Sequence, residues 1–156
     1  MSQAGQTDAC PFCQVLARGP EHDREQFVLE RARHNFILLN LYPYTTGHLL
    51  ITPYDHVARL DQVRPDALTE MMELARKLQA ALDACYHPQG YNLGMNFGRC
   101  AGAGVEDHVH LHLVPRWSGD SNFMTVVGET RVHPEDLLTT YDKLRAFLTP
   151  QRSLAG

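Results

Sequence analysis

Three histidines alternate with apolar residues in the segment His108-Val109-His110-Leu111-His112. If the segment is a strand, alternate side chains point to one face at intervals of about 6.6 Å. The three imidazoles then line a polar site, and the apolar residues between them face the core. An imidazole with an ordinary pKa near 6.5 can act as a nucleophile or a general acid at neutral pH. The residues alone leave two alternatives open, a solvent-facing strand and a three-histidine metal site.

A glycine-rich segment, residues 98–104, lies just before these histidines. Its small residues let backbone N–H groups approach an anion closely. Such a loop by itself is more often a simple connection between elements. Beside a strand of imidazoles, it predicts a cradle for a phosphate group.

Cys10 and Cys13 form a closely spaced pair that suits metal or redox chemistry. Together with two later histidines they could form a tetrahedral Cys2His2 zinc site. A reduced thiol pair is the alternative, and no thioredoxin-like βαβ pattern supports a redox pair. Cys85 falls on the apolar stripe of a helix, which indicates core packing.

Composition and charge limit the classes of protein to consider. The chain has 156 residues, of which 44% are hydrophobic, and this suits a single compact domain. We expect that domain at residues 10–150, with flexible ends at 1–9 and 151–156. No apolar run approaches the roughly 20 residues that a membrane-spanning helix needs, and no signal-peptide pattern is evident. We therefore expect a cytoplasmic protein without a membrane partner. A net charge of −4 without a basic block argues against nucleic-acid binding.

The remaining pattern predicts the elements that position these residues. Residues 10–18 suit a short helix or turn, and an apolar stripe predicts a long helix over 66–86, begun by Pro65. Alternation and turn residues predict strands over 27–30, 36–40, 48–52, 91–97 and 108–114. Pro134 is expected to open a last helix with an apolar face at Leu137, Leu138, Tyr141, Leu144 and Leu148.

With these motifs together, the chain resembles the histidine triad family, in its bacterial branch of dinucleoside polyphosphate hydrolases and phosphorylases. The likeness rests on the His-x-His-x-His motif at residues 108–112, the segment 40–53 that ends in Gly-His-Leu-Leu-Ile-Thr-Pro, and Pro115-Arg116-Trp117. It implies an α+β fold with a five-stranded antiparallel sheet and two main helices. It also implies a homodimer that uses the long helix and a sheet edge.

The resemblance implies a role for each matching residue. His110 would attack the α-phosphorus, with its other ring nitrogen held by a backbone carbonyl, while His112 contacts phosphate and His48 supports the triad. The remaining implied contacts are Asn40 for the ribose, Asn96 for the bridging phosphate region, Ala103 and Gly104 for the phosphate cradle, and Phe12, Leu16, Leu38 and Leu50 for the base. The implied zinc ligands are Cys10, Cys13, His56 and His108. Magnesium could accompany a polyphosphate substrate.

The expected activity is cleavage at the α-phosphate of adenosine nucleotides, such as diadenosine tetraphosphate, through a nucleotidyl-histidine. The alternatives are a dinucleoside polyphosphate phosphorylase and a nucleotide-sensing module without turnover. Water is favoured over phosphate as acceptor, because phosphorylase relatives with the same Pro-Arg-Trp ending carry a serine where Gly104 stands. A phosphoramidase is disfavoured, since that branch usually has glycines after the triad.

Overall fold

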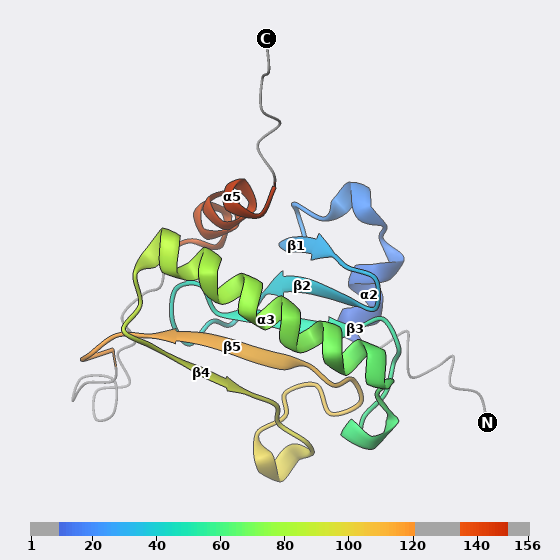
Figure 1. Cartoon of the computed structure of the whole chain (residues 1–156). Coiled ribbons are helices and arrows are strands. Elements are labelled where there is room, and N and C mark those ends of the chain that lie inside the picture. Colours follow the sequence, from blue (N-terminus) through green and yellow to red (C-terminus); the bar gives the residue numbers. More distant parts are fainter. Residues whose placement is uncertain (1–9, 121–134, 150–156) are drawn as a thin grey trace.

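The fold centres on one antiparallel sheet of five strands in the order β1-β2-β3-β5-β4 (Figure 1). The computed structural model describes residues 10–120 and 135–149. The strands are β1 (Val28–Arg31), β2 (Asn35–Leu39), β3 (Leu49–Pro53), β4 (Gly90–Gly94) and β5 (Leu111–Arg116). This sheet and its helices confirm the predicted α+β architecture. The ends expected to be flexible, 1–9 and 151–156, lie outside the described residues.

Two main helices and one short helix pack on the sheet. The main helices are α3 (Pro65–Tyr86) and α5 (Leu137–Leu148), and α2 (Pro11–Ala17) is a short helix near the amino terminus. Single 3₁₀ turns occur at η1 (Pro20–His22), η2 (Leu60–Gln62) and η3 (Arg99–Ala101). Pro134 lies outside the described residues; Asp136 caps α5, and its side chain accepts the N–H of Thr139.

The main core lies between α3, α5 and one face of the sheet. The stripe predicted on α3 is buried at Met71, Ala75, Leu78 and Leu82, but Met72 is 54% exposed. On α5, the outward-facing residue of the predicted apolar face is Leu138, which is 41% exposed. Both predictions were wrong for the same reason: at 100° per residue, Met72 and Leu138 each fall outside the arc of the helix that holds its buried residues.

The opposite face of the sheet is covered by α2 and carries the histidines. Leu38 of β2 and Leu50 of β3 are directly paired, and Leu50 is in turn paired with His112 of β5. Cys10 and Phe12 of the α2 segment pack on the two leucines in a second, smaller core. The sheet therefore separates a structural core on one side from a polar site on the other.

The histidine strand begins later than the sequence predicts, at Leu111 instead of His108. The pairing of β3 with β5 ends at Leu111, and the preceding residues are held by other bonds. The hydroxyl of Thr52 donates to the carbonyl of Val109, and the N–H of Val109 donates to the carbonyl of Val57. His108 and His110 are thus fixed by loop contacts at the end of the strand.

The predicted strand over 91–97 is also shorter, because β4 ends at Gly94. Of its apolar residues, Tyr91 and Met95 are partly buried against the main core, as expected of a half-buried strand, but Leu93 is 45% exposed and Phe97 is 39% exposed. β4 lies at the edge of the sheet, where one flank of each side chain has no neighbouring strand.

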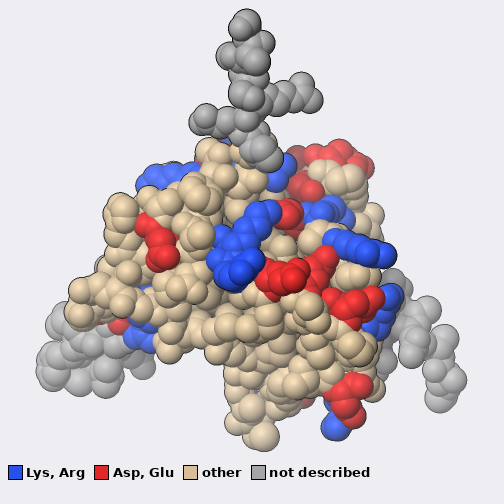
Figure 2. All heavy atoms as spheres, in the orientation of Figure 1, with Lys and Arg blue, Asp and Glu red and all other residues tan. Residues whose placement is uncertain are grey.

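Two observations concern the helices and the surface. None of the described helices is long and apolar enough to cross a membrane. On the face shown in Figure 2, basic and acidic side chains are interspersed and no continuous basic surface is seen.

Candidate active site

A cavity of about 570 Å³ opens on the α2 side of the sheet and ends at the histidines. Its apolar part is formed by Phe12 and Val15 of α2 with Leu38 and Leu50 of the sheet. Because Leu50 is paired with His112, the apolar residues of the cavity wall lie directly beside the histidines. A planar apolar group fits the first part, and a polar group attached to it reaches the second.

His110 presents one defined nitrogen to the cavity. Its Nδ1 lies 2.9 Å from the carbonyl oxygen of His108, and only a protonated Nδ1 can donate there. Burial lowers the pKa of His110 below 6.5, so the ring is neutral at pH 7 and its Nε2 carries a lone pair. This confirms the expected backbone contact, and it leaves the Nε2 lone pair of His110 available to act as a nucleophile.

His112 carries its proton on the opposite nitrogen. The backbone N–H of Tyr44 donates to Nδ1 of His48 (3.1 Å), so the proton of a neutral His48 is on Nε2. That Nε2 donates to Nδ1 of His112 over 2.9 Å, which leaves the His112 proton on Nε2. Burial, reinforced by the neighbouring histidines, lowers the pKa of His48 to about 3 and that of His112 to about 4.

The Nε2 atom of His112 is buried and has no hydrogen-bond partner among the described residues. A buried donor without an acceptor costs free energy, on the order of 1–3 kcal/mol. An anionic oxygen from a ligand would satisfy it. The site therefore pairs a lone pair on His110 with a donor on His112, which is the arrangement required to attack a phosphorus atom and hold its oxygens.

Asn40 lines the same cavity at the end of β2. Its Oδ1 accepts the N–H of Tyr42 over 2.9 Å, so the amide NH₂ group is turned toward the ring of His48, 3.4 Å from both ring nitrogens. Gly47, directly before His48, has φ of +81°, and a Cβ there would lie 2.8 Å from a methyl carbon of Leu82. Only glycine fits this turn without strain.

Gly102 and Gly104 of the glycine-rich loop line the cavity, together with Val105 directly after the loop. The N–H of Ala103 donates to the carbonyl of Gly98, so it is already used within the loop. Asn96 donates from Nδ2 to the carbonyl of Gly102 over 3.4 Å. In this structure, Asn96 and Ala103 therefore brace the loop, while Gly104 faces the cavity.

The cavity brings together many of the predicted site residues, but not all of them. Phe12, Leu38, Asn40, Leu50, Gly104, His110 and His112 lie in its wall. Leu16 packs on the small core beside it, and His48 lies behind His112. His108 belongs to a separate cluster, and the ring of Phe12 is close to both groups, at 5.3 Å from His108 and 5.1 Å from His110.

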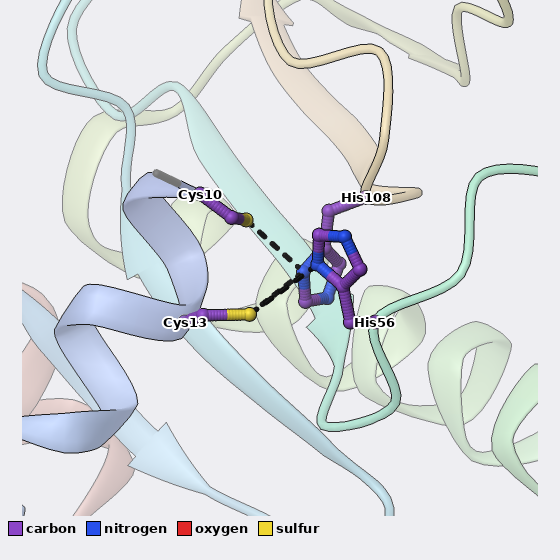
Figure 3. A group of neighbouring side chains, drawn as sticks. All are labelled: Cys10, Cys13, His56 and His108. Atoms are coloured by element: carbon purple, nitrogen blue, oxygen red, sulfur yellow. Dashed lines mark hydrogen bonds between the residues drawn. The ribbon is translucent and has the colours of Figure 1, made fainter. Parts of the chain in front are cut away.

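That cluster consists of the four predicted metal ligands (Figure 3). Cys10 and Cys13 come from the start of α2, His56 from the segment after β3, and His108 from the segment before β5. Their ligand atoms all lie within 4.8 Å of one another. Residues that are far apart in the sequence thus lie close together in the fold, and they could hold a metal ion.

The geometry and protonation of the cluster fit a tetrahedral ion. Tetrahedral zinc with its usual bond lengths places sulfur and nitrogen ligands about 3.6 Å apart. The distances here are 3.4 Å (Cys10–His108), 3.3 Å (Cys13–His56) and 3.7 Å (Cys13–His108). Nε2 of His108 donates to the carbonyl of Pro53 over 2.8 Å, so its Nδ1 lone pair faces the thiols.

The two thiols also need a positive charge nearby. Burial, and then the adjacent Cys10, raise the pKa of Cys13 to about 11. Cys13 is therefore a neutral thiol at neutral pH in the absence of a cation. A metal ion supplies the charge that lets both sulfurs bind as thiolates.

Two tyrosines at the mouth of the cavity were missed as site residues. Tyr42 and Tyr44 line its outer end, although their sequence context indicates only a turn. The available signal was their position next to Gly47-His48, in a segment already assigned to the site. Arg18 and Glu25 also line the cavity, and they form an exposed ion pair at 3.7 Å.

Comparisons with known proteins agree with this geometry. The model of the HIT domain family matches residues 21–119. An AP-4-A phosphorylase of Mycobacterium tuberculosis is 38% identical over 118 residues, which are 76% of this chain and 60% of that protein. An adenosine 5′-monophosphoramidase of Saccharomyces cerevisiae is 32% identical over 108 residues, which are 69% of this chain and 63% of that protein.

A solved structure shows the same fold. The zinc-bound histidine triad family protein from Mycobacterium smegmatis superimposes with a TM-score of 0.71 at 27% identity, over 90% of this chain and 93% of that one. The chain spans only about 60% of the length of the phosphorylase and about 63% of the phosphoramidase. The family match, the triad and the sheet together establish that this chain is a member of the histidine triad family.

Proposed function

We propose that this protein cleaves dinucleoside polyphosphates, such as diadenosine tetraphosphate, by transferring an adenylyl group to His110. The observation that carries the proposal is the pair of opposite tautomers at the end of an apolar cavity. Nε2 of His110 has a free lone pair, and Nε2 of His112 is a buried donor without a partner. Relatives that act on adenosine compounds support the substrate class.

The chemistry has two steps. The lone pair of His110 forms an N–P bond to the α-phosphorus while the P–O bond to the rest of the polyphosphate breaks, and the leaving oxygen keeps the electron pair. His112 donates to a phosphoryl oxygen, where negative charge gathers in the transition state. The oxygen of an acceptor, water or phosphate, then attacks the same phosphorus, and the N–P bond breaks with its electron pair returning to Nε2 of His110. Any proton carried by the attacking oxygen is released to solvent, and the neutral imidazole is restored.

Trapping the intermediate tests this proposal. The protein is mixed with diadenosine tetraphosphate, quenched at alkaline pH, and digested for mass spectrometry. We expect an added adenylyl mass on the peptide that contains His110, and none in the His110→Ala variant. Nucleotide binding by a folded protein without any adduct or product would instead indicate a sensing module and overturn the proposal.

For the acceptor we propose water. Gly104 lines the cavity and offers no hydroxyl to position an incoming phosphate. Inorganic phosphate is the second candidate, because the relative with 38% identity is a phosphorylase. Both routes share the first step on His110, so they differ only in the products.

We further propose that the metal site holds structural zinc. Cys10, Cys13, His56 and His108 would bind it and fasten α2 to the sheet, so the ion would act on the shape of the cavity and not on the phosphate. A zinc-bound structural relative supports the choice of metal. Magnesium would enter, if at all, bound to the polyphosphate.

We also propose that the protein forms a homodimer through the edge strand β4. Leu93 is paired with Leu113 of the main core, so its exposed side chain lies on the α3 side of an open sheet edge. Exposed apolar side chains on an edge strand favour pairing with a second strand. Analytical ultracentrifugation should give a homodimer that Leu93→Glu dissociates; a monomeric wild type would contradict it.

A further inference from the structure

The outer end of the cavity is an exposed apolar surface. It is formed by Leu41, Tyr42 and Tyr44, which are 55%, 81% and 61% exposed. Large apolar side chains clustered in this way at the mouth of a cavity often mark a contact with a ligand. The two-step chemistry above gives these residues no role.

Tyr44 continues a row of rings that begins inside the cavity. The centroid of Phe12 is 5.1 Å from that of His110, and His110 is 4.9 Å from His112. Tyr44 follows at 6.3 Å from His112, with the two ring planes only 7° apart. The row leads from the buried apolar end, across the two imidazoles that would hold a phosphate, to an exposed phenol ring.

The position of Tyr44 is fixed although its ring is exposed. Its N–H donates to His48, and its ring lies 4.7 Å from the ring of His48. The next residue, Thr45, donates from its hydroxyl to the carbonyl of Pro115 over 2.8 Å. A preformed exposed ring loses little conformational freedom when a second flat group stacks on it.

We propose that Tyr44 is the stacking platform for the second base of a dinucleoside polyphosphate. This inference rests on the proposed function and deepens it. When one base occupies the apolar end and the α-phosphate meets His110 and His112, the remaining polyphosphate must leave through the mouth. The base at its far end then meets an aromatic surface that is continuous with the cavity.

The test compares two ligands that differ only in the second adenosine, diadenosine tetraphosphate and adenosine 5′-tetraphosphate. Binding is measured by calorimetry in a His110→Ala background, so that neither ligand is consumed. Adding Tyr44→Ala should weaken diadenosine tetraphosphate binding about tenfold, the lower range for loss of one stacked base, and leave adenosine tetraphosphate unchanged. Adding Tyr44→Phe instead should restore the affinity.

The possible outcomes separate the two proposals. Equal weakening of both ligands, or of neither, would overturn the stacking role, whatever the trapping experiment shows. A lowered melting temperature in Tyr44→Ala with Tyr44→Phe unable to restore binding would assign the residue to support of His48 instead. Failure to form an adduct on His110 overturns the proposed function separately, because the binding measurement does not depend on turnover.

Discussion

Nε2 of His48 lies 2.9 Å from Nδ1 of His112, and this contact decides which nitrogen of His112 carries a proton. The backbone N–H of Tyr44 fixes His48 from its other side. A backbone N–H group thus controls, through two imidazoles, which nitrogen of His112 is a hydrogen-bond donor. His110 is fixed independently by the carbonyl of His108.

Replacing His48 by phenylalanine should remove the hydrogen bond that fixes the tautomer of His112. His48→Phe keeps a ring but removes the donor to His112, so His112 can take the wrong tautomer. We expect kcat to fall about 10- to 100-fold with little change in KM, as for other residues that orient a catalytic imidazole. His48→Gln, whose amide can still donate, should retain more activity. Equal kcat values for wild type and His48→Phe would remove His48 from the positioning role.

The buried histidines also predict how stability depends on pH. Because the pKa of His48 is about 3 in the folded protein and near 6.5 when unfolded, acid favours the unfolded chain below pH 6.5. Above pH 6.5 both states are neutral and His48 has no effect. At pH 5 its contribution should be a loss of about 2 kcal/mol relative to pH 7.

Urea unfolding at pH 7 and pH 5 measures this loss. The His48→Phe variant is the control, since it lacks the titrating group and should lose correspondingly less stability over the same interval. Metal loss at low pH affects both proteins and cancels in the comparison. The same pH dependence in both would mean that His48 is not held neutral by the fold.

The sequence predicted the individual strands and helices, because these depend on local periodicity. The five-stranded sheet and most of the cavity wall were implied by the resemblance to the family. The strand pairing from Leu38 through Leu50 to His112 then follows from the order of the strands. Periodicity does not indicate where a ladder ends, so the sequence placed His108 and His110 inside β5. It also does not distinguish an edge strand from a central one, which is why Leu93 was expected to be half-buried.

The protonation states of the site histidines could not be predicted from the sequence, for a different reason. The contact of a His110 ring nitrogen with a backbone carbonyl was expected from the mechanism of the family. The hydrogen bonds from the Tyr44 N–H to His48 and from His48 to His112 depend instead on the backbone direction in a turn, which no residue type indicates. Tyr44 itself was assigned no role from the sequence. Its role depends on the nearly parallel ring of His112, a contact between residues far apart in the chain.

Loss of the metal should damage the nucleotide cavity. Phe12 lies between the proposed ligands Cys10 and Cys13 in the sequence, and its ring contacts His110, so releasing α2 would remove one wall of the proposed base site. Elemental analysis should find about one zinc per chain in wild type. Cys13→Ser should lower zinc content, melting temperature and affinity for adenosine monophosphate together.

The exposed Cys100 supplies the matched control for this prediction. Cys100→Ser makes the same chemical change away from the cluster and should alter none of the three quantities. A zinc-free wild type with unchanged stability and nucleotide affinity would contradict the structural role of the ion.

The products of diadenosine tetraphosphate cleavage should identify the acceptor. Attack by water on the adenylyl group of His110 yields adenosine monophosphate and triphosphate. Attack by phosphate yields adenosine diphosphate and triphosphate, at a rate that rises with phosphate concentration. We expect the first pair, because Gly104 lacks the hydroxyl that would donate to an incoming phosphate, a contact worth about 0.5–1.5 kcal/mol.

That free energy corresponds to about a two- to twelvefold change in phosphate affinity, so the substitution Gly104→Ser is the informative variant. If the hydroxyl positions phosphate, Gly104→Ser should increase the yield of adenosine diphosphate at a fixed phosphate concentration and leave formation of the His110 adduct unchanged. Nucleotides are separated by ion-exchange chromatography with and without phosphate. Phosphate-dependent formation of the diphosphate by the wild type, with little monophosphate, would show that acceptor choice does not depend on residue 104 and would reverse the assignment of water.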